Sequence, residues 1–211
     1  MPRKADRPSE ADWDRVHRTN YARSVANVDA WFVSANELEY AAEQLRPRVQ
    51  EWWKRVIRWN RSKRRPRGPF PPLGCHSVSL MLVAFAIETL CKGALIRGNL
   101  VDAQDWDGSG IPRELRSHDL TKLVRSVGMQ IDEGEEYTLA QLGRAALWSG
   151  RYPFAATYHP AIHTVSLPGG RKFNAASYGE GDLSRAEALI AKLRKHLRVR
   201  RRYTTSRDAA P

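Results

Sequence analysis

The chain has 211 residues, a net charge of +12 and two cysteines. This length suits a single domain with basic appendages, and the first dozen residues contain no apolar run that would make a secretory signal. On one continuous helix Cys75 and Cys91 would lie about 24 Å apart, beyond disulfide reach, which indicates a reducing compartment. We therefore expect a cytoplasmic protein.

The positive charge is concentrated in two segments. Residues 46–67 hold ten Lys or Arg and one acid, and residues 192–207 hold eight Lys or Arg and no acid. The rest of the chain carries 17 basic and 22 acidic residues, a net charge of 17 − 22 = −5. Basic charge that is localised in this way favours an anionic partner such as a nucleic acid.

Polar residues dominate both ends of the chain. We expect residues 1–24 and residues 203–211 to be flexible segments, because they lack the apolar residues that would bury them. Residues 25–202 are predicted to form a single helical domain.

The first long helical pattern runs over about residues 25–60. Trp31, Leu38 and Leu45 recur there at helical spacing. Pro47 lacks an amide donor and disfavours helical backbone at the residue before it. We expect a kink or a break in the helix at this position.

Residues 75–99 are the predicted centre of the fold. Residues 78–87 are apolar on every side except at Ser79, and a helix that is apolar all round is a buried helix. Glu88 and Lys92 follow, four residues apart in the order that favours an ion pair. With these two charges the stretch is too short and too polar to be expected to span a membrane. Because buried charges must be paired, Glu88 and Lys92 form either a structural ion pair or the floor of a polar functional cluster.

Two shorter helices are predicted after the central one. The first covers about residues 118–127, with Ser117 as the expected cap of its amino terminus. The second covers about residues 135–148, and Asp132 and Glu135 have the spacing of a capping box. Each has Leu at helical spacing, which predicts one buried face.

The last part of the domain combines a hairpin with a final helix. Two extended runs flank a Pro-Gly-Gly turn within residues 156–181, which favours a small hairpin or an ordered loop. Ser184 and Glu187 have capping-box spacing for a helix over about residues 185–200. The predicted fold is therefore an all-α bundle of about five helices, with a central buried helix and a small loop or hairpin insertion before the last helix.

Three short patches, AIETLCKGALI, SHDLTKL and WSGRYPFA, occur in this order. The first resembles the central helix of HEPN (higher eukaryotes and prokaryotes nucleotide-binding) domains. The other two resemble the His-Asp-Leu helix start and the Arg-Tyr-Pro segment of bacterial HEPN-like families, and the match covers about residues 30–197 in order and layout. The resemblance implies a helical homodimer in a toxin–antitoxin, phage-defence or RNA-processing system, with an antitoxin or other operon product as protein partner.

Many HEPN domains are metal-independent ribonucleases, so the resemblance also implies a catalytic arginine and histidine. The family pattern is an arginine, four to six residues and a histidine, usually in the last helix, and this chain lacks that spacing before His196. Arg113 and His118 have four residues between them but lie at a predicted junction of loop and helix.

RNA cleavage without a metal needs a base for the 2′-hydroxyl and a cation for the phosphate. His118 is the candidate base, and Arg151 or Arg113 is the candidate cation. Glu88 and Lys92 would hold the site in shape. The structural alternatives are that His118 starts a helix, that Arg151 ends one, and that Glu88 and Lys92 are a plain ion pair.

Cations and tryptophans are mixed within residues 46–67. Cations bind phosphates and aromatic faces stack on bases, which favours a nucleic-acid contact. The alternative is a helix that packs its tryptophans inward and leaves its cations in solvent. The predicted nucleic-acid contacts are Arg55, Arg58, Arg61, Lys63, Arg64, Arg65 and Arg67.

No metal or cofactor is predicted. His159 and His163 have no supporting Cys/His cluster, and the chain has no phosphate loop, dinucleotide fingerprint or nucleophile elbow. The expected function is binding of RNA or a nucleotide, with metal-independent RNA cleavage as one form of it. The alternative is a non-catalytic module that dimerises or holds a partner protein. No membrane partner is expected.

Overall fold

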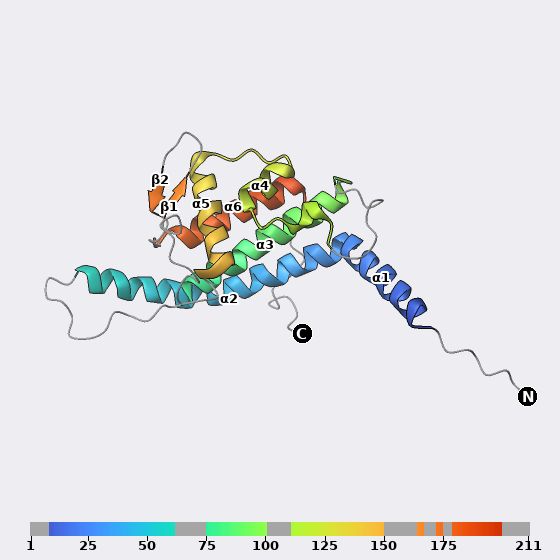
Figure 1. Cartoon of the computed structure of the whole chain (residues 1–211). Coiled ribbons are helices and arrows are strands. Elements are labelled where there is room, and N and C mark those ends of the chain that lie inside the picture. The colour runs from blue at the N-terminus through green and yellow to red at the C-terminus, as the bar shows by residue number, and fades with distance from the viewer. Residues whose placement is uncertain are drawn as a thin grey trace, which may run out of the picture.

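Two long antiparallel helices, α2 (Val28–Arg61) and α3 (His76–Arg97), form the axis of this chain (Figure 1). Three helices pack on α3, so the predicted all-α bundle with a central helix is confirmed. They are α4 (Leu120–Ser126), α5 (Glu133–Arg144) and α6 (Asp182–Leu197). The structure is a computed structural model that describes residues 9–61, 75–100, 111–149, 164–166, 172–174 and 179–199.

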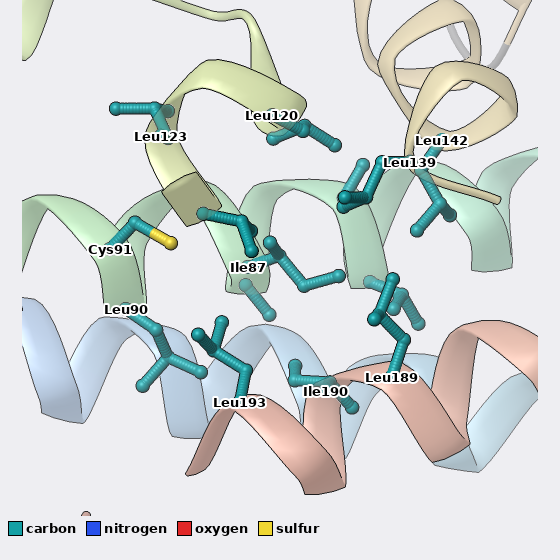
Figure 2. Close-up of a cluster of buried hydrophobic side chains, with 14 of the residues drawn as sticks. Ile87, Leu90, Cys91, Leu120, Leu123, Leu139, Leu142, Leu189, Ile190 and Leu193 are labelled. Carbon is teal, nitrogen blue, oxygen red and sulfur yellow. The ribbon is translucent and has the colours of Figure 1, made fainter. Parts of the chain in front are cut away.

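The core of the bundle is built around α3. Figure 2 shows Ile87 and Leu90 of α3 surrounded by side chains of α4, α5 and α6, and both residues are fully buried. Burying one such side chain stabilises the fold by roughly 1.5–3 kcal/mol. The neighbours that close around α3 include Leu120, Leu123, Leu139, Leu142, Leu189 and Leu193.

Among the described helices, α3 alone is long and apolar enough to cross a membrane by length and composition. We expected α3 to be too short and, with Glu88 and Lys92, too polar to meet these criteria for a membrane span. That expectation was wrong, because a stretch of α3 that contains two charged residues is still apolar enough on average. In the structure 72% of the most apolar window of α3 is buried by the rest of the bundle. A core helix meets the same length and composition criteria as a membrane span.

Of the kink or break predicted at Pro47, the break is not observed, because α2 continues through this residue. Pro47 cannot donate to the carbonyl group of Glu43, four residues earlier, and the helix therefore lacks one hydrogen bond there. Ala42 and Val49, one on each side of the proline, are both buried. Packing of both halves of α2 thus outweighs the lost bond.

Residues 1–24 were expected to be flexible, but most of this segment belongs to a helix that we did not predict, α1 (Glu10–Ala26). Its start is a capping box: Ser9 Oγ accepts from the Asp12 amide at 3.2 Å, and Asp12 accepts from the Ser9 amide at 3.1 Å. Of its residues, only Val25 is buried. The weak apolar periodicity of α1 hid the helix, although the capping residues are readable in the sequence.

The residue that caps the start of α4 differs from the predicted one, whereas the cap of α5 is as predicted. Asp119, and not Ser117, caps α4, because its carboxylate accepts from the Lys122 amide at 3.0 Å. Asp132 and Glu135 form the predicted capping box of α5. A short 3₁₀ turn (Arg113–Arg116) precedes α4, and a π-helical turn (Ala145–Ser149) follows α5.

The last helix, α6, begins earlier than predicted. It starts at Asp182, so Ser184 lies inside its first turn and the expected Ser184–Glu187 capping box is wrong. The predicted hairpin before it is confirmed as two antiparallel strands, β1 (Thr164–Ser166) and β2 (Lys172–Asn174).

Gly93 of α3 marks the closest approach of α2 and α3. A methyl group at this position would lie 2.9 Å from Cβ of Trp31 and 3.0 Å from Cε1 of Phe32. We expect Gly93→Ala to destabilise the protein by about 1–3 kcal/mol, because the two helix backbones would have to separate. Urea denaturation followed by circular dichroism measures this change.

The matched control is Gly143→Ala in α5, where no described atom lies within 4 Å of the added methyl group. We expect this variant to be more stable than the parent by about 0.5–1 kcal/mol, because alanine has the higher helix propensity. Equal effects of the two substitutions would contradict the close helix contact.

Candidate functional site

Glu88, Lys92 and His118 meet on the side of α3 that faces α4. Lys92 Nζ donates to Glu88 Oε1 at 2.5 Å. His118 Nδ1 lies 3.0 Å from Glu88 Oε1 and 3.1 Å from Glu88 Oε2. His118 precedes Asp119, the cap residue of α4, so the start of that helix positions the imidazole on the carboxylate. We call these three residues the Glu88 cluster.

The members of the Glu88 cluster differ in their exposure. The side chains of Lys92 and Glu88 are 8% and 10% exposed, whereas the side chain of His118 is 60% exposed. The ionised carboxylate can only accept, so His118 Nδ1 carries the proton of this hydrogen bond. Nε2 of the same ring is then the nitrogen that can exchange protons with a bound molecule.

Cys91 lies beside this cluster on α3 and is not a nucleophile at neutral pH. Burial raises the pKa of its thiol to about 12, and the negative charge of Glu88 acts in the same direction. The thiolate is the reactive form of cysteine, so this side chain stays protonated and inert. Cys75 and Cys91 are both free thiols, in agreement with the sequence prediction.

The two candidate arginines are not shown to join the cluster. Arg113 is exposed in the 3₁₀ turn, and no contact between it and the Glu88 cluster is recorded among the described residues. Arg151 lies outside the described residues. Of the five predicted catalytic residues, the structure therefore brings together Glu88, Lys92 and His118.

The predicted nucleic-acid contacts fall at the carboxyl end of α2. Arg55, Arg58 and Arg61 are exposed there, and Arg55 also donates to Glu51 at 3.3 Å. The tryptophans of this region pack inward in part, because Trp52 is buried. The remaining predicted contacts, Lys63, Arg64, Arg65 and Arg67, lie outside the described residues.

The Glu88 cluster lies near the middle of α3, whereas the basic end of α2 lies beside and beyond the start of α3. Trp53 of α2 contacts His76 at the start of α3, and α3 carries Glu88 twelve residues further on. At 1.5 Å per residue this is about 18 Å, and in the other direction Arg55 lies about 3 Å and Arg61 about 12 Å beyond Trp53. The three arginines are therefore about 21 to 30 Å from Glu88 along the helix axes.

A second polar cluster, which the sequence analysis did not single out, joins the starts of α3 and α6. Trp53 Nε1 donates to His76 Nδ1 at 3.3 Å, and Nε2 of the same ring lies 3.9 Å from Asp182 Oδ2. Burial alone would raise the pKa of Asp182, but the nearby His76 imidazole, the hydrogen bond from the Gly179 amide and the charge of Arg185 hold it below its usual value. His76 and Asp182 are almost fully buried, so this cluster fastens helix ends together.

A third polar cluster joins α2 to α6. Arg194 Nε donates to both carboxylate oxygens of Glu39, at 2.9 Å and 3.0 Å, and Arg194 Nη2 donates to Asn36 at 2.7 Å. All three residues are buried. The sequence contains one signal of this cluster: Glu39 and Arg194 each stand within an otherwise apolar helix face.

Comparisons of the chain with models of protein families, with curated proteins and with solved structures found no match. Within the described ranges there is no group of three or more His, Cys, Asp or Glu residues placed to hold a metal ion.

Lys92 depends on Glu88 for its burial. We expect Glu88→Gln to destabilise the protein by about 3 kcal/mol, because it leaves the buried ammonium group without a counter-ion. The double variant Glu88→Gln with Lys92→Met should recover part of this loss, since the charge is then gone as well. Urea denaturation at neutral pH measures all the variants.

His118→Ala is the matched control, because it removes the exposed partner of the same carboxylate. It should change the free energy of unfolding by about 1 kcal/mol or less. If the double variant were as unstable as Glu88→Gln alone, the buried charge of Lys92 would not be the cause.

Proposed function

We propose that this chain is a HEPN-like protein that binds RNA or a nucleotide, with His118 as the proton-transfer residue of a metal-independent ribonuclease centre. One observation carries the proposal: an imidazole that is 60% exposed lies 3.0 Å from a carboxylate that is 90% buried. A histidine held in one orientation with one nitrogen open to solvent is suited to general acid–base catalysis.

The chemistry requires a base, an acid and a cation. In RNA cleavage the 2′-oxygen loses its proton and attacks the adjacent phosphorus, and the 5′-oxygen leaves with a proton. His118 Nε2 would accept the first proton, Glu88 would stabilise the imidazolium that forms, and a water molecule would supply the proton of the leaving 5′-oxygen. Lys92 is buried against Glu88, so it tunes the carboxylate and does not reach a phosphate. Arg113 or Arg151 would supply the cation for the phosphate.

RNA binding is assigned in this proposal to the basic end of α2. Three exposed arginines, Arg55, Arg58 and Arg61, follow one another along the last two turns of the helix. Because these arginines lie about 21 to 30 Å from Glu88 along the helix axes, an RNA that reaches both regions must be extended, or the second protomer of a homodimer must supply the basic end. The HEPN resemblance further suggests a cytoplasmic defence or toxin–antitoxin role with a protein antitoxin.

The alternative, a non-catalytic interaction module, has its own support in α1. This helix exposes Trp13, Val16 and Tyr21, at 52%, 44% and 40% of their surfaces. Large apolar side chains on a helix with little packing of its own are suited to a protein partner. In this alternative the Glu88 cluster is purely structural.

The cleavage proposal is tested on labelled single-stranded RNA in the presence of a metal chelator. We expect the parent protein to cleave and His118→Ala to lose at least about 100-fold in rate, because it removes the proton-transfer residue. His17→Ala, which removes an exposed histidine of α1, is the control and should cleave at the parent rate. Equal rates for parent and His118→Ala, or no cleavage by the parent, would exclude this mechanism.

The binding proposal is tested by the salt dependence of RNA affinity. Replacing Arg55, Arg58 and Arg61 together with glutamine should weaken binding and lower the slope of log affinity against log salt by about 2, at about 0.7 for each phosphate contact. Fluorescence anisotropy of a labelled RNA at several salt concentrations gives both quantities.

The charge-matched control carries glutamine in place of Arg15, Arg18 and Arg23 of α1. It has the same net charge as the α2 variant, so a general charge effect would weaken both equally. Equal salt slopes for the two triple variants would contradict an RNA site at the end of α2 and favour the interaction module.

A further inference from the structure

Helix α1 is the element of this structure with the least cover. Figure 1 shows it extending away from the bundle, and among the described residues no other helix packs along it. Only Val25, next to its carboxyl end, is buried. Most of the stability of a protein helix comes from the packing of its apolar face, so a helix of 17 residues that stands alone is marginal in water. A partner that covers α1 would therefore stabilise it.

One side of α1 presents large side chains to such a partner. Trp13 is 52% exposed and Val16 is 44% exposed. They are three residues apart, so they lie on the same side of the helix, and Tyr21, at 40% exposure, lies at the edge of that side. Large apolar side chains that gather on one exposed helix face mark an interaction surface. We call this side of the helix the Trp13 face.

The charges of α1 are divided between its two halves. Residues 10–14 contain three acids and no Lys or Arg, whereas residues 15–26 contain three Arg and no acid. A second α1 that runs in the opposite direction would set its arginines against these acids and its acids against these arginines. A parallel second helix would set like charges together, and its dipole would also oppose the pairing. The charge pattern of α1 is therefore complementary to itself, as a two-fold contact between identical copies requires.

Asp12 and Arg23 are the charges that would meet in such a contact. They are eleven residues apart, about three turns, so they lie along the same edge of the Trp13 face. Arg23 is exposed and forms no ion pair with any other described residue. Asp12 accepts from Arg15 at 2.8 Å, but the Arg15 side chain is 78% exposed, and an exposed pair of this kind contributes little. Asp12 also accepts from Ser9, and a carboxylate has about four acceptor positions, so one remains for Arg23 of a second copy.

We propose that the Trp13 face of α1 pairs with the same face of a second copy of this chain, antiparallel and centred midway between residues 12 and 23. Each Asp12 then faces Arg23 of the other copy. The helix is about 26 Å long, so the contact lies at the small end of specific interfaces, below about 1,200 Å², and the dimer dissociates at micromolar concentrations.

This pairing involves neither the Glu88 cluster nor the basic end of α2, so it holds or fails independently of RNA binding and cleavage. It also leaves the α1 control variants of the RNA experiments valid, because the chain is monomeric at nanomolar protein concentrations.

Sedimentation velocity of the full chain between about 1 and 200 µM tests the association. We expect the average mass to rise from that of the monomer toward that of the dimer. Trp13→Lys should weaken the association at least about tenfold, because it places a charge within the contact. Ala11→Lys is the control, since it adds the same charge on the opposite side of α1 and should associate as the parent does. A parent chain that stays monomeric, or equal association by Trp13→Lys and the parent, would overturn the proposal.

An exchange of charges tests the antiparallel direction. Arg23→Glu sets two acids together at both ends of the contact, and Asp12→Lys sets two bases together, so each variant should associate about tenfold more weakly than the parent. An equal mixture of the two should associate more strongly than either alone, because the mixed dimer again has an acid opposite a base at both ends. Circular dichroism checks that α1 persists, and the Ser9 cap does not need the Asp12 side chain, because Ser9 Oγ accepts from the amide of that residue. A mixture that associates no better than its components would rule out the antiparallel pair.

Discussion

Burial of most of α3 is the constraint on which the rest of the structure depends. A helix without a polar face must be covered over most of its surface, and here α2, α4, α5 and α6 each supply part of the cover. This requirement accounts for the passage of α2 through Pro47 and for the close contact at Gly93, since both allow α2 to lie along most of α3. Glu88 and Lys92 of α3 can be buried beneath these helices only because they neutralise each other.

Several of the charged residues that enter the core form clusters that join helices. His76 and Asp182 link the starts of α3 and α6, and Glu39 and Arg194 link α2 to α6. The Glu88 cluster differs from both, because its third member, His118, is open to solvent. The exposure of one member, and not the presence of charge, is therefore what distinguishes the candidate site from a structural ion pair in this fold.

The success of sequence-based prediction varied with the range of the interaction. The apolar run before Glu88 and the capping box at Asp132 are local patterns, and both were predicted correctly. The start of α6 was missed, because Asp182 acts through His76, which is more than 100 residues away in the chain. His118 was selected as a candidate, but its contact with Glu88 required the placement of α4 on α3.

By itself the sequence determined the helical class, the central helix, the pairing of Glu88 with Lys92 and the localisation of positive charge, since each depends on residues within a few helical turns. Only the tertiary structure decided which charges meet across helices and how far apart the candidate regions lie. It placed His118 on Glu88, Arg194 on Glu39, and the basic end of α2 about 21 to 30 Å from Glu88. The reason is that such contacts depend on the packing of whole helices, which no local pattern of residues encodes.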